Sequence, residues 1–137
     1  MKERAWIESQ LDNAAAFVEM FSPKDAGQPL TLAALDRAFA AWIAAQDIGD
    51  PALINGIINS VGIAFGKFLV DGFGFDWVIA TDVHGSDLAV YGLPGKGDVP
   101  VYPANFVAKR WERREANFLV ESYQKISNQV QAITHRP

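Results

Sequence analysis

Apolar side chains recur every three or four residues through the first half of the chain, which is the spacing of an amphipathic helix. This pattern predicts helices over residues 4–21, from near Thr31, and from Asp50 to about Asp71. Thr31 and Asp50 each carry a side-chain oxygen that can cap the free amides of a first helical turn, and Pro51 loses no hydrogen bond there. Gly72 is expected to end the third helix in a left-handed conformation.

The third predicted helix is apolar over most of its circumference. Its segment Leu53–Val70 is barely long enough to suggest a membrane span. The polar residues Asn55, Asn59 and Lys67 interrupt that segment, so we interpret it as a buried helix at the centre of a globular core, with no membrane association.

Three glycines lie inside this helix, at positions 56, 62 and 66. Each costs about 1 kcal/mol of helix stability relative to alanine. We therefore expect another element to approach the helix backbone closely, and Gly62 and Gly66 share one face that can serve as the contact surface.

After this helix the pattern changes to short β-type runs at residues 77–81, 88–91 and 99–102. Asp82 to Gly85 fits a type I turn between the first two runs. Pro100 cannot donate to a sheet ladder, which predicts that the third strand lies at an edge. A helix is expected to begin at Pro103.

A final helix is predicted from Glu115 to about Ile133. The sequence as a whole predicts a single α+β domain over residues 1–137, with helices packed on a three-stranded antiparallel β-meander. Residues 1–48 form an N-terminal helical pair, and residues 50–125 form the rest of the core.

Composition and charge narrow the function classes. The chain has no cysteine, which excludes disulfides and thiolate metal sites and favours a cytoplasmic location. The net charge is −4, distributed as 6 Lys/Arg against 13 Asp/Glu (−7) in residues 1–108 and 6 against 3 (+3) in residues 109–137. This acidic body argues against nucleic-acid binding, which needs a concentrated basic surface.

An ordered set of short motifs gives the chain a family resemblance. Its most specific parts are the glycine-spaced run Val61–Gly66 with the following Phe75–Val78, and the run Val107–Glu112; Asp82–Gly85 and Leu88–Val90 lie between them. In this order they resemble a bacterial domain-of-unknown-function family, number 3806, over roughly residues 50–125. The resemblance implies a small bacterial α+β domain and carries no functional residues with it.

No pattern indicates metal, phosphate or cofactor binding. Asp82, His84 and Asp87 do not have the spacing of a calcium loop, and the glycine-rich segment 92–97 is not followed by the helix that a phosphate loop requires. The chain has two histidines, at positions 84 and 135, and neither lies in a strand–turn–helix elbow that would hold a nucleophile. We assign no catalytic residue and no cofactor. A carboxylate pair stays open, because aspartates flank the predicted sheet at positions 71, 76, 82, 87 and 98.

The strongest candidate for a binding surface is a basic cluster around one tryptophan. If the helix that begins at Pro103 continues through the cluster, Lys109 and Arg113 are like charges four residues apart, and so are Arg110 and Arg114. Such pairs are unfavourable unless an opposite charge compensates them. Aspartates of the sheet loops opposite the cluster are one source of compensation. The other interpretation is a binding surface with the indole as its anchor, since Trp and Arg are enriched in binding hot spots. The cluster consists of Lys109, Arg110, Trp111, Arg113 and Arg114.

The hydrophobic strand Trp77–Thr81 lies at the other edge of the predicted meander. Exposed apolar edges pair readily with other strands, so we expect a homodimer or partner contact there unless a helix covers it.

Three functional hypotheses follow, and the acidic body argues most strongly against one of them, nucleic-acid binding with bases stacked on Trp111. The first is a non-enzymatic protein-interaction module of bacterial origin. The alternative is a small-ligand-binding or enzymatic domain with a pocket between sheet and helices, lined by Trp77, Tyr91 and Tyr102.

Overall fold

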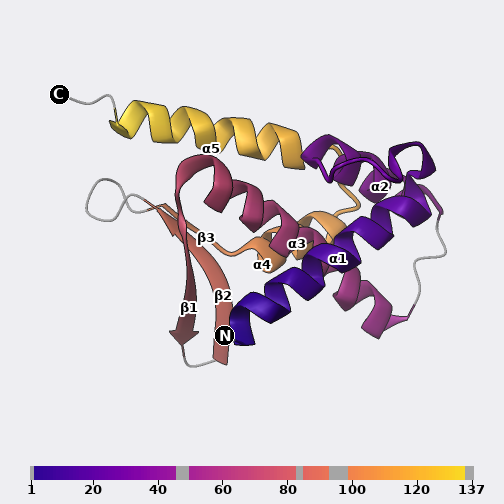
Figure 1. Ribbon diagram of the computed structural model, residues 1–137, viewed down its shortest axis with the longest axis horizontal. Helices are drawn as coiled ribbons and strands as arrows, with labels where there is room; N and C mark the ends of the chain where they lie inside the picture. Colours follow the sequence, from indigo (N-terminus) through magenta and orange to yellow (C-terminus); the bar gives the residue numbers. More distant parts are fainter. Residues whose placement is uncertain (1, 46–49, 83–84, 93–98, 135–137) are drawn as a thin grey trace.

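The computed structural model describes residues 2–45, 50–82, 85–92 and 99–134, and this part of the chain is mostly helical (Figure 1). The predicted α+β fold is confirmed in part, because the structure is largely α with a minor β component. A short 3₁₀ turn, η1 (Pro23–Asp25), follows the first helix. The helices are α1 (Lys2–Phe21), α2 (Leu32–Ala45), α3 (Pro51–Phe73), α4 (Pro103–Glu112) and α5 (Leu119–Thr134).

The sheet has the predicted meander topology, with strand order β1-β2-β3 and antiparallel pairing throughout. The strands are β1 (Asp76–Asp82), β2 (Gly85–Gly92) and β3 (Val99–Val101). Asp82 pairs with Gly85 at the end of the hairpin, as the predicted turn requires. The two residues between them, 83 and 84, lie outside the described residues, as does the glycine-rich segment after Gly92.

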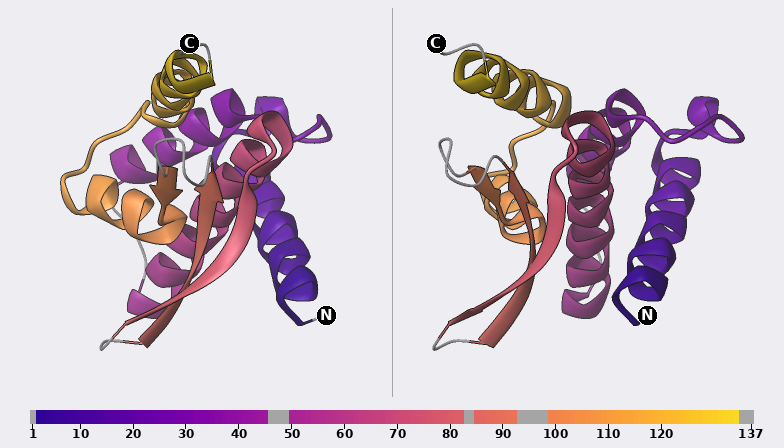
Figure 2. Two further views of the ribbon diagram at one scale, coloured as in Figure 1. Left: turned by 90° about the vertical axis from the view of Figure 1, so that its left-hand side faces the viewer. Right: turned by 60° about the vertical axis from the view of Figure 1, so that its left-hand side comes forward.

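The core is formed mainly by helices packed on helices. One continuous hydrophobic cluster joins buried side chains from all five helices, including Phe17 of α1, Phe39 of α2 and Leu119 of α5. Among the strand side chains that the structure describes, only Ala89 and Val90 are buried. Figure 2 shows the reason: the β1–β2 hairpin diverges from helix α3 in the direction of the hairpin's turn. The helices therefore cover one another more than they cover the sheet, contrary to the predicted arrangement.

The predicted starts of α2 and α3 are confirmed in detail. The Asp50 carboxylate accepts a hydrogen bond of 2.8 Å from the Leu53 amide, and Pro51 occupies the first helical turn. The Thr31 hydroxyl accepts one of 3.1 Å from the Ala34 amide. These side chains satisfy amides that have no partner inside their own helices.

The predicted end of α3 is wrong by two residues, and the reason is tertiary packing. Gly74, with φ of 69°, is the left-handed residue, and its N–H bonds to the Val70 carbonyl at 3.0 Å. Gly72 stays helical. A side chain at position 72 would collide with the Tyr123 hydroxyl of α5, so this glycine permits close contact between α3 and α5.

The expected close approach to the other glycines of α3 is confirmed at two positions. A Cβ at position 62 would lie 2.8 Å from the backbone of Ala104 in α4, and a Cβ at position 66 would collide with the Trp77 ring. The expectation is wrong for Gly56, where nothing lies within 4 Å.

Helix α3 is long and apolar enough, by length and composition alone, to cross a membrane. However, 56% of that apolar stretch is buried inside the protein, and Val61, Ala64 and Phe65 are fully enclosed by neighbouring elements. This burial is typical of a core helix, in agreement with the interpretation from the sequence.

The last helix begins at Leu119, four residues later than predicted, because a distant side chain caps it. The buried carboxylate of Asp36, in α2, accepts hydrogen bonds from the amides of Leu119 (2.8 Å) and Val120 (3.0 Å). Asn117 has φ of 60°, which interrupts the helical conformation just before this start. Asp36 is only 7% exposed, so its charge is balanced mainly by these two amides and the positive end of α5.

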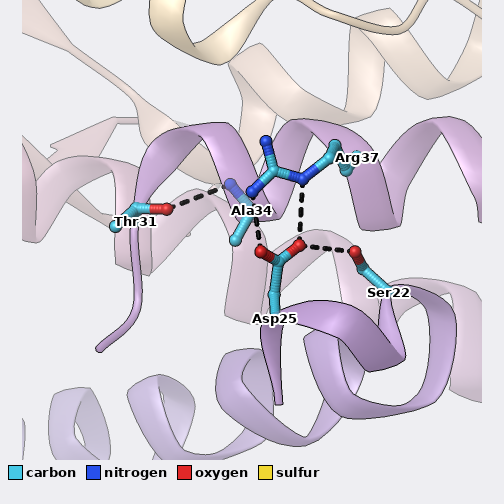
Figure 3. A network of polar contacts seen from close by, with 5 residues as sticks. All are labelled: Ser22, Asp25, Thr31, Ala34 and Arg37. Atoms are coloured by element: carbon cyan, nitrogen blue, oxygen red, sulfur yellow. Dashed lines mark hydrogen bonds and ion pairs between the residues drawn. The ribbon is translucent and has the colours of Figure 1, made fainter. Parts of the chain in front are cut away.

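Asp25 ties the segment after α1 to α2 (Figure 3). Its carboxylate accepts hydrogen bonds from the Arg37 guanidinium at 2.7 and 2.9 Å and from the Ser22 hydroxyl at 2.6 Å. Hydrogen bonding from Arg37, and then from Ser22, lowers the pKa of Asp25 from 3.8 to about 2.

We predict that Asp36→Ala lowers the free energy of unfolding by about 2–3 kcal/mol, because it leaves one buried and one partly buried amide without acceptors. Urea denaturation measures the loss, and hydrogen exchange should show faster exchange in the first turn of α5. Asp12→Ala, an exposed acidic residue of α1, should change stability by less than about 0.5 kcal/mol. Equal effects of the two substitutions would contradict the role of the cap.

We also predict that Arg37→Gln returns the pKa of Asp25 toward 3.8, measured by carbon NMR of the carboxyl groups. Because the folded-state pKa is lowered, ionised Asp25 stabilises the fold above pH 3.8, and this contribution is lost as the pH falls toward about 2. The stability advantage of the wild type over Arg37→Gln should shrink over the same range. Arg4→Gln is the control, and the prediction fails if Asp25 already titrates at its ordinary pKa in the wild type.

Candidate functional site

The predicted basic cluster lies at the end of α4, where the helix stops and the chain reverses. Arg114 has φ of 55°, its amide bonds to the Trp111 carbonyl at 3.0 Å, and the Glu115 amide bonds to the Arg110 carbonyl at 2.9 Å. These two bonds form a Schellman motif with arginine in the position that glycine usually takes. A continuous helix would place Arg110 and Arg114 on one face as neighbouring like charges. Because the helix ends here, they do not lie on one helical face.

Trp111 packs into the protein rather than standing free on its surface. Its ring is stacked on Trp42 with 6.1 Å between centroids, and it is half-buried. The Arg114 guanidinium lies 4.1 Å from the Trp111 ring and donates a hydrogen bond of 2.6 Å to the Trp111 carbonyl. These contacts offset the strain of a left-handed arginine, and they give Trp111 and Arg114 a structural role.

Arg110 is also held by neighbouring groups. It forms an ion pair of 2.7 Å with Glu115, and its guanidinium lies 5.2 Å from the Phe106 ring. Arg113 lies 4.0 Å from the same Glu115 carboxylate. The compensating charge that the structure shows is therefore Glu115. Compensation by the aspartates of the sheet loops stays a prediction, because the side chains of Asp82, Asp87 and Asp98 lie outside the described part.

Lys109 and Arg110 border a hollow of about 410 Å³ between α4 and α5, together with Lys125 and Ser122. Sequence reasoning missed Lys125, because nothing local in α5 indicates that it faces α4. Lys125 is paired with Glu121 at 3.1 Å. Most of the cations around this hollow thus have an internal partner, which weakens the case for an anion-binding surface here.

The three aromatic residues of the predicted pocket are not brought together. Trp77 packs its ring against Gly66 and borders a hollow beside α1. Tyr102, just before α4, borders two other hollows, on either side of that helix. Tyr91 lies in the sheet between Asp76 and Pro100.

Two large hollows flank the β1–β2 hairpin instead. We call the first the edge groove; it has a volume of about 670 Å³ and lies between α1, α3 and β1. We call the second the amide hollow; it has a volume of about 900 Å³ and lies between α3, α4 and the start of α1. Leu88 borders both. The edge groove is lined by Arg4, Ile7, Glu8, Leu11, Lys67, Val70, Trp77, Val78, Ile79 and Leu88, and the amide hollow by Trp6, Asn55, Ile58, Asn59, Ile63, Leu88, Tyr102, Ala104, Asn105 and Ala108.

Over residues 2–45, 50–82, 85–92 and 99–134, no group of three or more metal-ligating side chains comes together. His84 and His135 lie outside these residues. Of the aspartates that could form a carboxylate pair, Asp71 is occupied by an ion pair of 2.6 Å with Lys67, and Asp76 lies across the hairpin from Tyr91.

The fold and its surface define a small helical domain with a short antiparallel sheet and open hollows on either side of a projecting hairpin. The chain belongs to the family described as "Domain of unknown function (DUF3806)", whose model matches residues 37–123. The match begins inside α2, earlier than the predicted residue 50, and so includes Phe39 and Trp42 of the core. Comparison with curated proteins and with solved structures found no match.

We predict that Trp111→Ala lowers the free energy of unfolding by about 2–4 kcal/mol, because it removes the ring that packs on Trp42. Arg113→Ala, in the same cluster but exposed, should change stability by less than about 0.5 kcal/mol. Urea denaturation of both variants tests this difference. A Trp111→Ala variant as stable as the wild type would mean that the indole is free for a binding role.

Proposed function

We propose that this protein is a non-enzymatic interaction module that binds an extended segment of a partner protein along strand β1. The observation that carries the proposal is the open edge of the sheet. Within the described residues β1 pairs only with β2, which leaves the outer backbone groups of a seven-residue strand without sheet partners. Val78 is 36% and Ile79 is 53% exposed on this strand. A bound strand would satisfy these backbone groups and cover both side chains.

The edge groove supplies a place for the side chains of such a segment. Trp77, Val78 and Ile79 are consecutive and all border it, although successive residues of a strand point to opposite faces. The groove therefore follows the edge of β1 and not one face alone. Ile7 and Leu11 of α1 and Val70 of α3 form apolar walls that can take the inward-facing side chains of an added strand.

Charge favours a different chain over a second copy as the occupant. An antiparallel pairing of two β1 strands centred on Ile79 would place Asp76 of each copy opposite Asp82 of the other, and like charges directly opposite are destabilising. Residues 1–108 carry a net charge of −7, which attracts a basic segment. The proposed partner segment has apolar residues at alternate positions and Lys or Arg at both ends. The same charge disfavours nucleic acid as the partner.

The test is a selection from a displayed library of random peptides against the full chain. The selected peptides should show alternating apolar residues with basic ends. Amide chemical shifts on binding should change along β1 and around the edge groove, and the outer β1 amides should exchange more slowly. Ile79→Lys should weaken the selected peptides at least about tenfold, because it places a charge against an apolar segment.

The matched control is Val120→Lys, which changes an equally exposed apolar residue on α5. It should leave binding unchanged. The proposal fails if no peptide is selected, if the peptides shift resonances elsewhere, or if both variants bind alike. A concentration-dependent dimer lost in Ile79→Lys would instead indicate that the second copy is the occupant.

A second candidate function, small-ligand binding, is supported by the amide hollow beside the hairpin, which Tyr102 borders but Trp77 and Tyr91 do not. Its three carboxamides, of Asn55, Asn59 and Asn105, form no hydrogen bond with any other described residue. A hollow with unused polar groups among apolar side chains is the usual form of a small-ligand site.

A further inference from the structure

Asn55, which is exposed, and Asn59, which is half-buried, form a polar stripe on the otherwise apolar helix α3. Asn55 and Asn59 are four residues apart and lie on the same helical face, and both border the amide hollow. Asparagine is a poor residue for a helix interior, about 0.5 kcal/mol or more below alanine. Neither side chain contributes a hydrogen bond to the described part of the fold, so their cost to the helix is not offset by an internal contact.

A third carboxamide borders the same hollow from a separate element. Asn105 belongs to the first turn of α4, which is held against α3 by the close contact at Gly62. The two helices thus fix the backbones that carry the three amides. Each amide offers an N–H donor and a carbonyl acceptor, and among the described residues no charged side chain borders the hollow.

This chemistry selects an uncharged ligand. Among the described residues of the lining, a phosphate, a carboxylate or an ammonium group would meet no opposite charge. A ligand with several hydroxyls can both donate to and accept from each carboxamide.

Two exposed aromatic side chains complete the lining. Trp6 of α1 is 42% exposed and Tyr102 is 45% exposed, and they reach the hollow from different elements. Aromatic rings offer flat apolar faces with a polar edge, which suit a ring that presents C–H groups on its faces and hydroxyls around its rim. The volume of about 900 Å³ is that of a site for a ligand of two or three such rings.

We propose that the amide hollow binds a neutral saccharide, with Asn55, Asn59 and Asn105 bonding its hydroxyls and Trp6 and Tyr102 contacting its ring faces. This inference rests on the second candidate function and is independent of strand addition at β1. A nucleotide would also stack on these rings, but its phosphates would find no cation among the described residues of this lining.

The experiment is titration of the full chain with cellotriose, maltotriose, mannotriose and chitotriose, followed by calorimetry and by ligand-observed saturation-transfer NMR. At least one should bind with a Kd between about 10 μM and 1 mM. Trigalacturonate, a charged trisaccharide, should bind at least about tenfold more weakly, because its carboxylates must be desolvated.

The variant Asn55→Ala/Asn59→Ala should weaken the bound saccharide at least about tenfold while keeping or raising the thermal midpoint, since alanine is the better helix former. Asn13→Ala/Asn128→Ala removes two carboxamides elsewhere and should leave the affinity unchanged. Trp6→Leu should reduce saturation transfer to the sugar ring protons.

Absence of binding by all four neutral sugars, or binding unaffected by Asn55→Ala/Asn59→Ala, would overturn the inference. Ile79→Lys should retain saccharide binding, and the asparagine variant should retain peptide binding. The failure of one proposal is therefore distinguishable from the failure of the other.

Discussion

The arrangement of this protein depends on one carboxylate placed at a distant helix end. Asp36 accepts hydrogen bonds from the Leu119 and Val120 amides across 83 and 84 positions of sequence, and it is buried while doing so. A buried charge of this kind is tolerated only where its hydrogen bonds are made, so α2 and α5 are held in one relative position. That position brings Phe118 onto Phe39 and brings Tyr123 over Gly72 of α3. Asp36, one residue before the family-matched part of the chain, thus joins α2 to α5 in the same core.

Local sequence signals predicted most of the helices and strands, because caps and alternating patterns act over a few residues. Thr31, Asp50 and Pro51 start helices where expected, and Pro100 lies in an edge strand. The errors occur where a distant group decides the outcome. Gly72 has the composition of a helix terminator, but Tyr123 makes it a contact point, and Asp36 rather than the local sequence fixes the start of α5.

The candidate sites were also predictable only as far as local sequence determines them. The composition of residues 109–114 predicted a surface, and the structure uses Trp111, Arg110 and Arg114 largely to close the end of α4. Nothing local indicated that Asn105 would border the same hollow as Asn55 and Asn59, because that depends on the approach of α4 to Gly62. The exposed edge at β1 was predictable from strand order, since a three-stranded meander must have two edges. The edge groove beside it was not, because its walls come from α1 and α3.

The two edges of the sheet are unequal. The β3 edge is only three residues long and contains Pro100, which has no N–H, so it is a poor template for another strand. The β1 edge has seven residues and exposed apolar side chains. Fibres that grow by strand addition need an open edge at each end of every subunit. If a sheet can be extended on one side only, its growth stops with the first strand that it accepts. Association through such a sheet has a fixed stoichiometry and does not propagate into a polymer.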